Sequence, residues 1–237
     1  MAPAARMAFP PAPGRGVMSQ ARVAGGFKGW LMRESEFFEK ALTLRSRIAL
    51  LVAAVILLPA FVFPLWHMKF TSNQYLDGLD LQIYAYQLEG GKSPERDDLR
   101  EINALNHYIG MRPLLESDFS EFSWLPFAIG GLILLTLRAM VVGKMSNLID
   151  VFVLFSYFGL YSFWSFYHRM YQYGHNLDPT AAIKVPPFTP PLLGVQPVGN
   201  FTVASYPGIA SYALIAFSLL LLAAMFLSWK AAPVTQD

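Results

Sequence analysis

Four long apolar runs constrain the fold of this chain more than any other feature of its sequence. They cover residues 48–66, 124–142, 149–167 and 208–229. Each run is close to the roughly 20 helical residues that cross a hydrocarbon core about 30 Å thick. Charged residues make up only 14% of the chain, against roughly 25% in soluble domains. The sequence therefore predicts an all-α membrane protein with four transmembrane helices and two long extracytoplasmic loops, residues 67–123 and 168–207.

The distribution of lysine and arginine predicts the orientation of these spans. Basic residues gather before the first span, and Arg138 and Lys144 lie at the end of the second span and in the short link that follows it. The loop 67–123 carries five basic and ten acidic residues. Cytoplasmic segments of membrane proteins are enriched in Lys and Arg. We therefore expect both termini in the cytoplasm and both long loops on the periplasmic side of a bacterial inner membrane.

The segment before the first span divides into two parts. Residues 1–27 are rich in Ala, Pro, Gly and Arg, a composition typical of a disordered tail. Residues 28–46 carry Leu31, Phe38 and Leu42 at helical spacing with basic flanks, which favours an amphipathic helix lying on the membrane. A cytoplasmic helix continuous with the first span would give the same pattern. The four-helix membrane domain then covers residues 48–229.

The two outer loops have different patterns. In the first, the alternation of Leu79 to Ile83 predicts a short strand. A helix should begin at Ser93-Pro94 and stop near Gly110, because Ser suits an N-cap and Pro the first helical position. The second loop is proline-rich, so we expect it to be extended and to pack over the outer surface of the bundle.

Several classes of function are disfavoured by what the sequence lacks. The chain contains no cysteine, which excludes disulfides, thiolate metal sites and a cysteine nucleophile. It shows no basic stripe, zinc-finger spacing or phosphate-binding glycine loop, so we expect no nucleic-acid partner. No Ser/His/Asp spacing resembles a hydrolase motif, and we expect no enzymatic activity.

The histidines and their methionine neighbours are the candidate metal ligands. All four histidines fall on the outer side under the predicted topology, and His107 and Met111, four residues apart, should share a helix face. Imidazole and thioether without thiolate suit copper. The candidate ligands are His107, Met111, His175, His67, Met68, His168 and Met170. The histidines could instead be polar anchors at the membrane surface, with the methionines as packing residues.

A haem b site is the alternative metal hypothesis. It would need two histidines on different helices. His67 ends the first predicted span and His168 follows the third, so the two could face each other near the outer leaflet.

Three strings carry a resemblance to a known group of proteins. They are Leu105-Asn106-His107-Tyr108-Ile109-Gly110-Met111, Tyr173-Gly174-His175-Asn176-Leu177-Asp178-Pro179 and Pro187-Phe188-Thr189-Pro190-Pro191. Over about residues 60–210 the chain resembles bacterial multi-span membrane proteins associated with accessory systems for periplasmic copper enzymes of the nitrous oxide reductase type. The resemblance implies a setting of copper-enzyme maturation and no particular residue role.

Together these features predict an integral membrane accessory protein that binds or delivers copper on the periplasmic face. Its partner would be a periplasmic copper protein. The alternatives are a structural or electron-transfer subunit of a respiratory complex, with a cytochrome as its partner, or a scaffold without metal.

Overall fold

The computed structural model describes residues 36–198 and 200–230. The chain divides into two units, Met1–Lys40 and Ala41–Asp237. In the first unit, residues 36–39 form one helical turn. The predicted tail 1–27 and residues 28–35 of the predicted interfacial helix lie outside the described residues, and residues 40–43 are not helical. All that follows concerns the second unit.

Four helices of the second unit are long and apolar enough to cross a membrane, which confirms the prediction of four candidate spans. They are α2 (Leu44–Ile56) with the 3₁₀ turn η1 (Leu58–Phe61), α4 (Glu121–Val142), α5 (Met145–His175) and α6 (Ile209–Lys230). The first span ends at Phe61 instead of Trp66, since Pro59 breaks the α-helix and Trp66 begins a strand.

Small residues bring α2 and α6 side by side. The buried ones are Ser46, Ala53 and Ala54 of α2, and Ala210, Ala213, Ala224 and Ser228 of α6. Such residues let helix backbones approach closely in a membrane. At the end of this pair the Ser228 hydroxyl donates to Ser46 Oγ at 2.7 Å, and the Ser46 hydroxyl donates to the Ala224 carbonyl at 2.9 Å. Both of these buried serine hydroxyls therefore have hydrogen-bond partners.

The prediction of an all-α protein is wrong, because the two outer loops together form a five-stranded antiparallel sheet. Its order is β3-β2-β1-β7-β6. The strands are β1 (Trp66–Thr71), β2 (Leu79–Ile83), β3 (Leu88–Gly90), β6 (Gly194–Val198) and β7 (Phe201–Pro207). Only β2 was predicted. The proline-rich second loop is extended, as expected, but its residues 201–207 pair with β1 of the first loop, and residues 194–198 pair in turn with residues 201–207.

The helix of the first loop begins later than predicted. Helix α3 covers Asp98–Tyr108, and the Asp97 side chain caps it by accepting from the backbone N–H of Leu99 and Arg100. The expected start at Ser93-Pro94 lies instead in a small hairpin of β4 (Lys92–Ser93) and β5 (Arg96–Asp97). The helix therefore starts at the Asp97 N-cap, after the hairpin turn that contains Pro94, and not at the Ser-Pro pair. A short 3₁₀ turn, η2 (Glu116–Asp118), follows α3.

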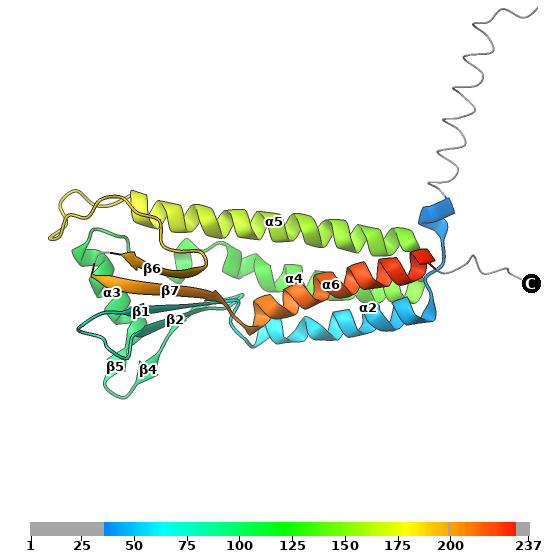
Figure 1. Ribbon diagram of the computed structural model, residues 1–237, viewed down its shortest axis with the longest axis horizontal. Helices are drawn as coiled ribbons and strands as arrows, with labels where there is room; N and C mark the ends of the chain where they lie inside the picture. Colours follow the sequence, from blue (N-terminus) through cyan, green and yellow to red (C-terminus); the bar gives the residue numbers. More distant parts are fainter. Residues whose placement is uncertain (1–35, 199, 231–237) are drawn as a thin grey trace, which may run out of the picture. The chain divides into compact units, whose positions relative to one another are not determined.

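One face of the sheet packs against α3 and the end of α5. Met68, Leu81 and Val203 of the sheet form a buried cluster with Ile102 of α3 and Met170 of α5. Helix α5 has 31 residues and is about 46 Å long at 1.5 Å per residue, longer than a hydrocarbon core of about 30 Å. Its last turns therefore extend past the bundle and along the sheet (Figure 1).

The bundle continues into the sheet through a tight crossing. Strand β1 follows α2 and η1, and β7 leads into α6, so two adjacent helices continue into two paired strands. The Gly208 N–H donates to the Leu65 carbonyl at 2.7 Å. A Cβ on Gly208 would lie 2.1 Å from the Pro64 carbonyl oxygen. Only glycine fits this crossing.

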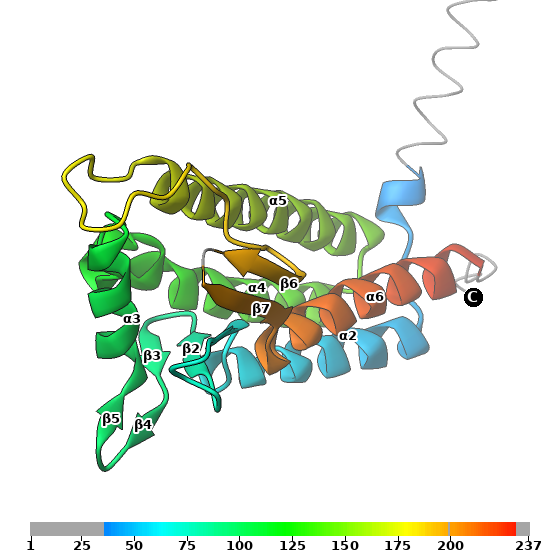
Figure 2. The same cartoon turned by 60° about the vertical axis from the view of Figure 1, so that its left-hand side comes forward.

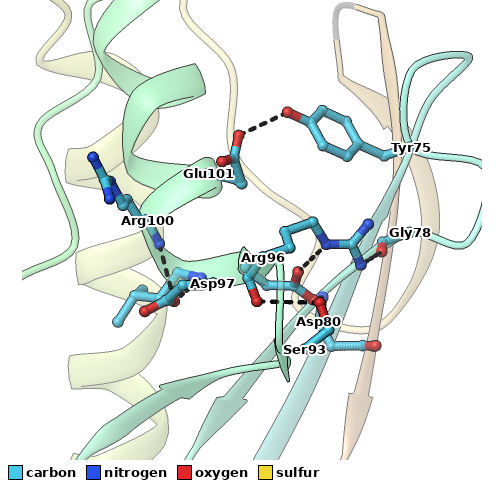
Figure 3. A network of polar contacts seen from close by, with 10 residues as sticks. Tyr75, Gly78, Asp80, Ser93, Arg96, Asp97, Arg100 and Glu101 are labelled. Atoms are coloured by element: carbon cyan, nitrogen blue, oxygen red, sulfur yellow. Dashed lines mark hydrogen bonds and ion pairs between the residues drawn. The ribbon is translucent and has the colours of Figure 1, made fainter.

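A polar network fixes the start of α3 to the sheet (Figure 3). The Asp98 side chain, 4% exposed, accepts from Arg96 Nε at 2.6 Å and from the Asp80 N–H at 2.8 Å. Arg96 also donates to the Gly78 carbonyl at 3.1 Å. The Tyr75 hydroxyl donates to Glu101 at 2.9 Å, and this hydrogen bond, with partial burial, raises the pKa of Tyr75. Each polar group here has a defined partner.

Candidate metal-binding pocket

A pocket of about 450 Å³ opens at the C-terminal end of α3. Its lining residues come from the end of α3 and from the proline-rich loop, which passes α3 at the sheet-bearing end of the bundle (Figure 2). Its lining residues are His107, Tyr108, Gly110, Met111, Arg112, Pro113, Asp178, Thr180, Ala181 and Ala182. The pocket therefore brings together two candidate ligands, His107 and Met111, with the carboxylate of Asp178.

The end of α3 places Met111 beside His107. Gly110 has φ of 79°, in the left-handed region that favours glycine. The Met111 N–H donates to the Asn106 carbonyl at 2.8 Å and the Gly110 N–H to the His107 carbonyl at 3.2 Å. These two bonds form a Schellman motif, which ends the helix and turns the chain back. Met111 thus lies beyond the helix and reaches the pocket through this turn, not through helical spacing.

Backbone contacts hold the proline-rich loop onto the same helix end. The Asp178 N–H donates to the Gly110 carbonyl at 2.8 Å, and the Ile183 N–H to the Tyr108 carbonyl at 2.9 Å. A Cβ on Gly110 would meet the Asp178 carbonyl oxygen at 2.8 Å. This close approach fixes residues 178–183 as the second wall of the pocket.

The pocket has features that favour a cation. The Thr180 hydroxyl and N–H both donate to Asp178 Oδ1, at 2.6 and 2.8 Å. These two bonds, together with the nearby His107, hold the pKa of Asp178 below its usual value. The C-terminal end of a helix adds partial negative charge. Arg112 supplies positive charge, but it pairs with Asp118 at 3.6 Å.

His107 differs from the other three histidines in its hydrogen bonding. His67 pairs with Asp80 at 3.2 Å, His168 with Gln172 at 2.9 Å, and His175 Nδ1 with the Tyr171 carbonyl at 3.0 Å. In the described part of the chain, no hydrogen bond or ion pair involves the His107 ring. Its imidazole is therefore available to a ligand in the pocket.

The structure separates His67 from Met68. They are neighbours on β1, and successive residues of a strand point to opposite faces. Met68 is 2% exposed in the cluster between the sheet and α5, whereas His67 lies on the other face with Asp80. These two side chains do not converge on one site.

His168 and Met170 are separated in the same way by a helix. Residues two apart on a helix do not share a face. Met170 is buried in the sheet cluster, and His168 is exposed and stacked on Trp164. His175 stacks on Tyr171 with ring centroids 3.8 Å apart and is not among the residues that line the pocket.

The pairing of His67 and His168 required for haem b is not found. Helix α5 packs on the sheet face that carries Trp66, with the Trp66 and Phe166 ring centroids 5.2 Å apart. His67 lies on the opposite sheet face, and His168 is exposed on α5. The sheet therefore lies between the two imidazoles.

Within residues 36–198 and 200–230, no group of three or more His, Cys, Asp or Glu side chains could hold a metal ion. The pocket offers two such residues, His107 and Asp178, and the thioether of Met111. It therefore has the composition of an open site with few protein ligands. The donors are those that copper accepts, since imidazole and thioether both bind it.

Two features of this region could not be found from spacing alone. The contact of Asp178 and Thr180 with the end of α3 depends on the loop meeting that helix, and the sequence places them about 70 residues from His107. From the sequence, Asp178 is a carboxylate that could orient a histidine or cap a turn, and neither reading places it beside His107. The pair of Glu121 and Arg169 was also missed, although each lies near the end of an apolar run.

No protein-family model matches the chain, and no curated protein sequence matches it significantly. The pocket itself is therefore the basis for the function proposed below.

Proposed function

We propose that this protein is an integral membrane accessory protein that binds copper on its extramembrane side and passes it to a periplasmic copper protein. The observation that supports the proposal is the pocket at the end of α3, where His107 and Met111 meet Asp178. The four apolar helices suit a lipid bilayer. The excess of Lys and Arg before α2 favours cytoplasmic termini in a bacterial inner membrane.

The chemistry follows from three side chains. The His107 imidazole and the Met111 thioether are donors that suit Cu(I), with imidazole also accepting Cu(II). Asp178, whose pKa the Thr180 hydrogen bonds lower, contributes negative charge next to His107. Thr180 therefore acts as a positioning residue for the carboxylate, as outer-shell partners do in metal sites.

The openness of the site suits transfer better than storage. Two walls, the end of α3 and residues 178–183, leave the pocket accessible to solvent. A metal held by two or three protein donors can accept a further ligand from another protein before it leaves the first. Copper is thus a cargo in this proposal, and an incoming His or Met of the partner would displace Met111 or His107.

Elemental analysis of detergent-purified protein loaded with Cu(I) tests the proposal. We expect about one copper per chain, with marked loss in His107→Ala and in Met111→Leu, since Leu keeps the packing volume but removes the thioether. His67→Ala is the matched control, because His67 lies on the far face of the sheet and should leave the copper content unchanged.

Two results would contradict the proposal. Copper content that is equal in His107→Ala and in the unaltered protein would place the metal elsewhere. Haem absorption with bound iron would favour an electron-transfer subunit. In either case the pocket would not be a copper site.

A further inference from the structure

The outward face of α5 carries a stripe of polar and aromatic residues along its whole length. Asp150, Tyr157, Trp164 and Tyr171 are seven residues apart and share one face of the helix. All four are exposed. Helix α5 is also the least buried of the four spans, with 17% of its apolar stretch buried against 28% to 33% in the other three. It lies along one side of the bundle (Figures 1 and 2).

Tyr157 is the residue of this stripe that a lipid environment does not explain. It lies twelve residues from Met145, where α5 begins, and twelve from Arg169, which is paired with the start of α4. At 1.5 Å per residue it is about 18 Å from each, in the middle of a hydrocarbon core. Tyrosines facing lipid gather at the two interfaces, where the hydroxyl reaches water. Trp164 and Tyr171 fit that rule, and Tyr157 does not.

The Tyr157 hydroxyl has no hydrogen-bond partner among the described residues of the protein. Its side chain is 77% exposed. An unpaired hydroxyl in hydrocarbon is strongly unfavourable. By contrast, the Ser156 hydroxyl next to it donates to the Phe152 carbonyl at 2.8 Å. The outward direction of Tyr157 therefore requires a hydrogen-bonding group from outside this chain.

We propose that the Tyr157 face of α5 is the docking surface for a transmembrane helix of a different protein. That helix offers a hydrogen-bond acceptor at mid-membrane depth and packs its side chains against Tyr157, Leu160 and Trp164. Polar side chains between helices are a common means of association in membranes.

The charge of Asp150, at one end of the stripe, favours a different protein over a second copy of this chain as the docking partner. Two copies of this chain share one orientation in the membrane, so a symmetric contact along α5 would set residues of equal number opposite each other. Asp150 would then face Asp150 of the other copy, and like charges at that level repel. A different protein with a neutral or basic residue there avoids the conflict.

Photo-crosslinking in intact cells tests this surface. The photoreactive amino acid p-benzoylphenylalanine replaces Leu160, which is 72% exposed one turn from Tyr157. In a parallel chain it replaces Leu134, an exposed apolar residue of α4. We expect Leu160 to give one discrete product with a transmembrane peptide of a different protein, and Leu134 to give lipid adducts only.

The hydroxyl is then removed in the chain that carries the Leu160 probe. Tyr157→Phe should lower the yield of the product about fivefold, the worth of a typical hydrogen bond. Tyr212→Phe, which removes an exposed hydroxyl from α6, should leave it unchanged. The proposal is overturned by lipid adducts alone at Leu160, by a product of two copies of this chain, or by a yield that Tyr157→Phe does not change.

Discussion

The Arg169 guanidinium donates to the Glu121 carboxylate at 2.5 Å and joins the last turns of α5 to the first residue of α4. The two side chains are 21% and 17% exposed. Arg169 also donates to the Asp118 backbone carbonyl, and the Ser165 hydroxyl donates to the Glu121 carboxylate. The charges therefore have several partners, which is the condition under which a buried ion pair holds two elements in one arrangement. Here it holds α5 where the bundle meets the sheet.

Replacing Arg169 by Met should destabilise the fold strongly. It leaves the Glu121 carboxylate largely buried without its counter-charge, and the loss of one partner of such a pair costs about 3–5 kcal/mol. Thermal unfolding of the protein in detergent, followed by circular dichroism, measures the change.

The exposed pair of Arg112 and Asp118 provides the comparison. It is 3.6 Å apart and Arg112 is 62% exposed, so Arg112→Met should cost about 0–1 kcal/mol. Equal shifts in the unfolding temperature of the two variants would show that burial does not control the worth of the Glu121–Arg169 pair.

The crossing of Gly208 and Pro64 gives a second prediction. In Gly208→Ala the new Cβ meets a backbone carbonyl, and overpacking of this kind costs about 1–3 kcal/mol. Gly131→Ala in α4 is the matched control, because nothing lies within 4 Å of its Cβ position. Gly131→Ala should be neutral or stabilising, since alanine has the higher helix propensity. The two unfolding temperatures should therefore change in different directions or by clearly different amounts.

The four spans could be predicted from sequence because hydrophobicity over about 20 residues is a local property. The sheet could not, because its central pairing joins β1 to β7, more than 130 residues further along the chain. Each strand alone is short. The sequence also favours Trp66 as the end of a span, because tryptophan is common at the membrane interface. The alternation of Trp66, Met68 and Phe70 with His67 and Lys69 was the available signal for β1.

The same limit applies to the pocket. The Met111 position next to His107 was predicted from helical spacing, but it results from the left-handed Gly110. Sequence proximity groups Met68 and Met170 with their histidine neighbours, although a strand and a helix each turn such close neighbours to different faces. Predicting the secondary structure of residues 66–71 correctly would have separated His67 from Met68.

Two adjacent carboxylates give a third prediction. Asp98→Ala removes the buried acceptor of Arg96 and of the Asp80 N–H, and we expect a loss of about 3–5 kcal/mol. Asp97→Ala removes only the N-cap of α3, which typically costs about 1 kcal/mol. Thermal unfolding of both variants checks this order. A larger loss in Asp97→Ala would mean that the network in Figure 3 contributes less than the helix cap.

The last prediction concerns the pH dependence of the pocket. Because Thr180 holds the pKa of Asp178 below its usual value, the carboxylate stabilises the folded state above its unfolded pKa. That contribution is lost as the pH falls through the lower, folded pKa.

Thr180→Val removes the hydroxyl donor, so the pKa of Asp178 should rise toward its usual value. A carbon-13 NMR titration of the Asp178 carboxyl between about pH 2 and 6 spans the usual aspartate range and measures the midpoint. Thr71→Val, at the end of β1, is the control and should leave that midpoint unchanged. If both variants titrate like the unaltered protein, Thr180 does not set the charge of the pocket, and the cation preference inferred for it loses one of its two sources.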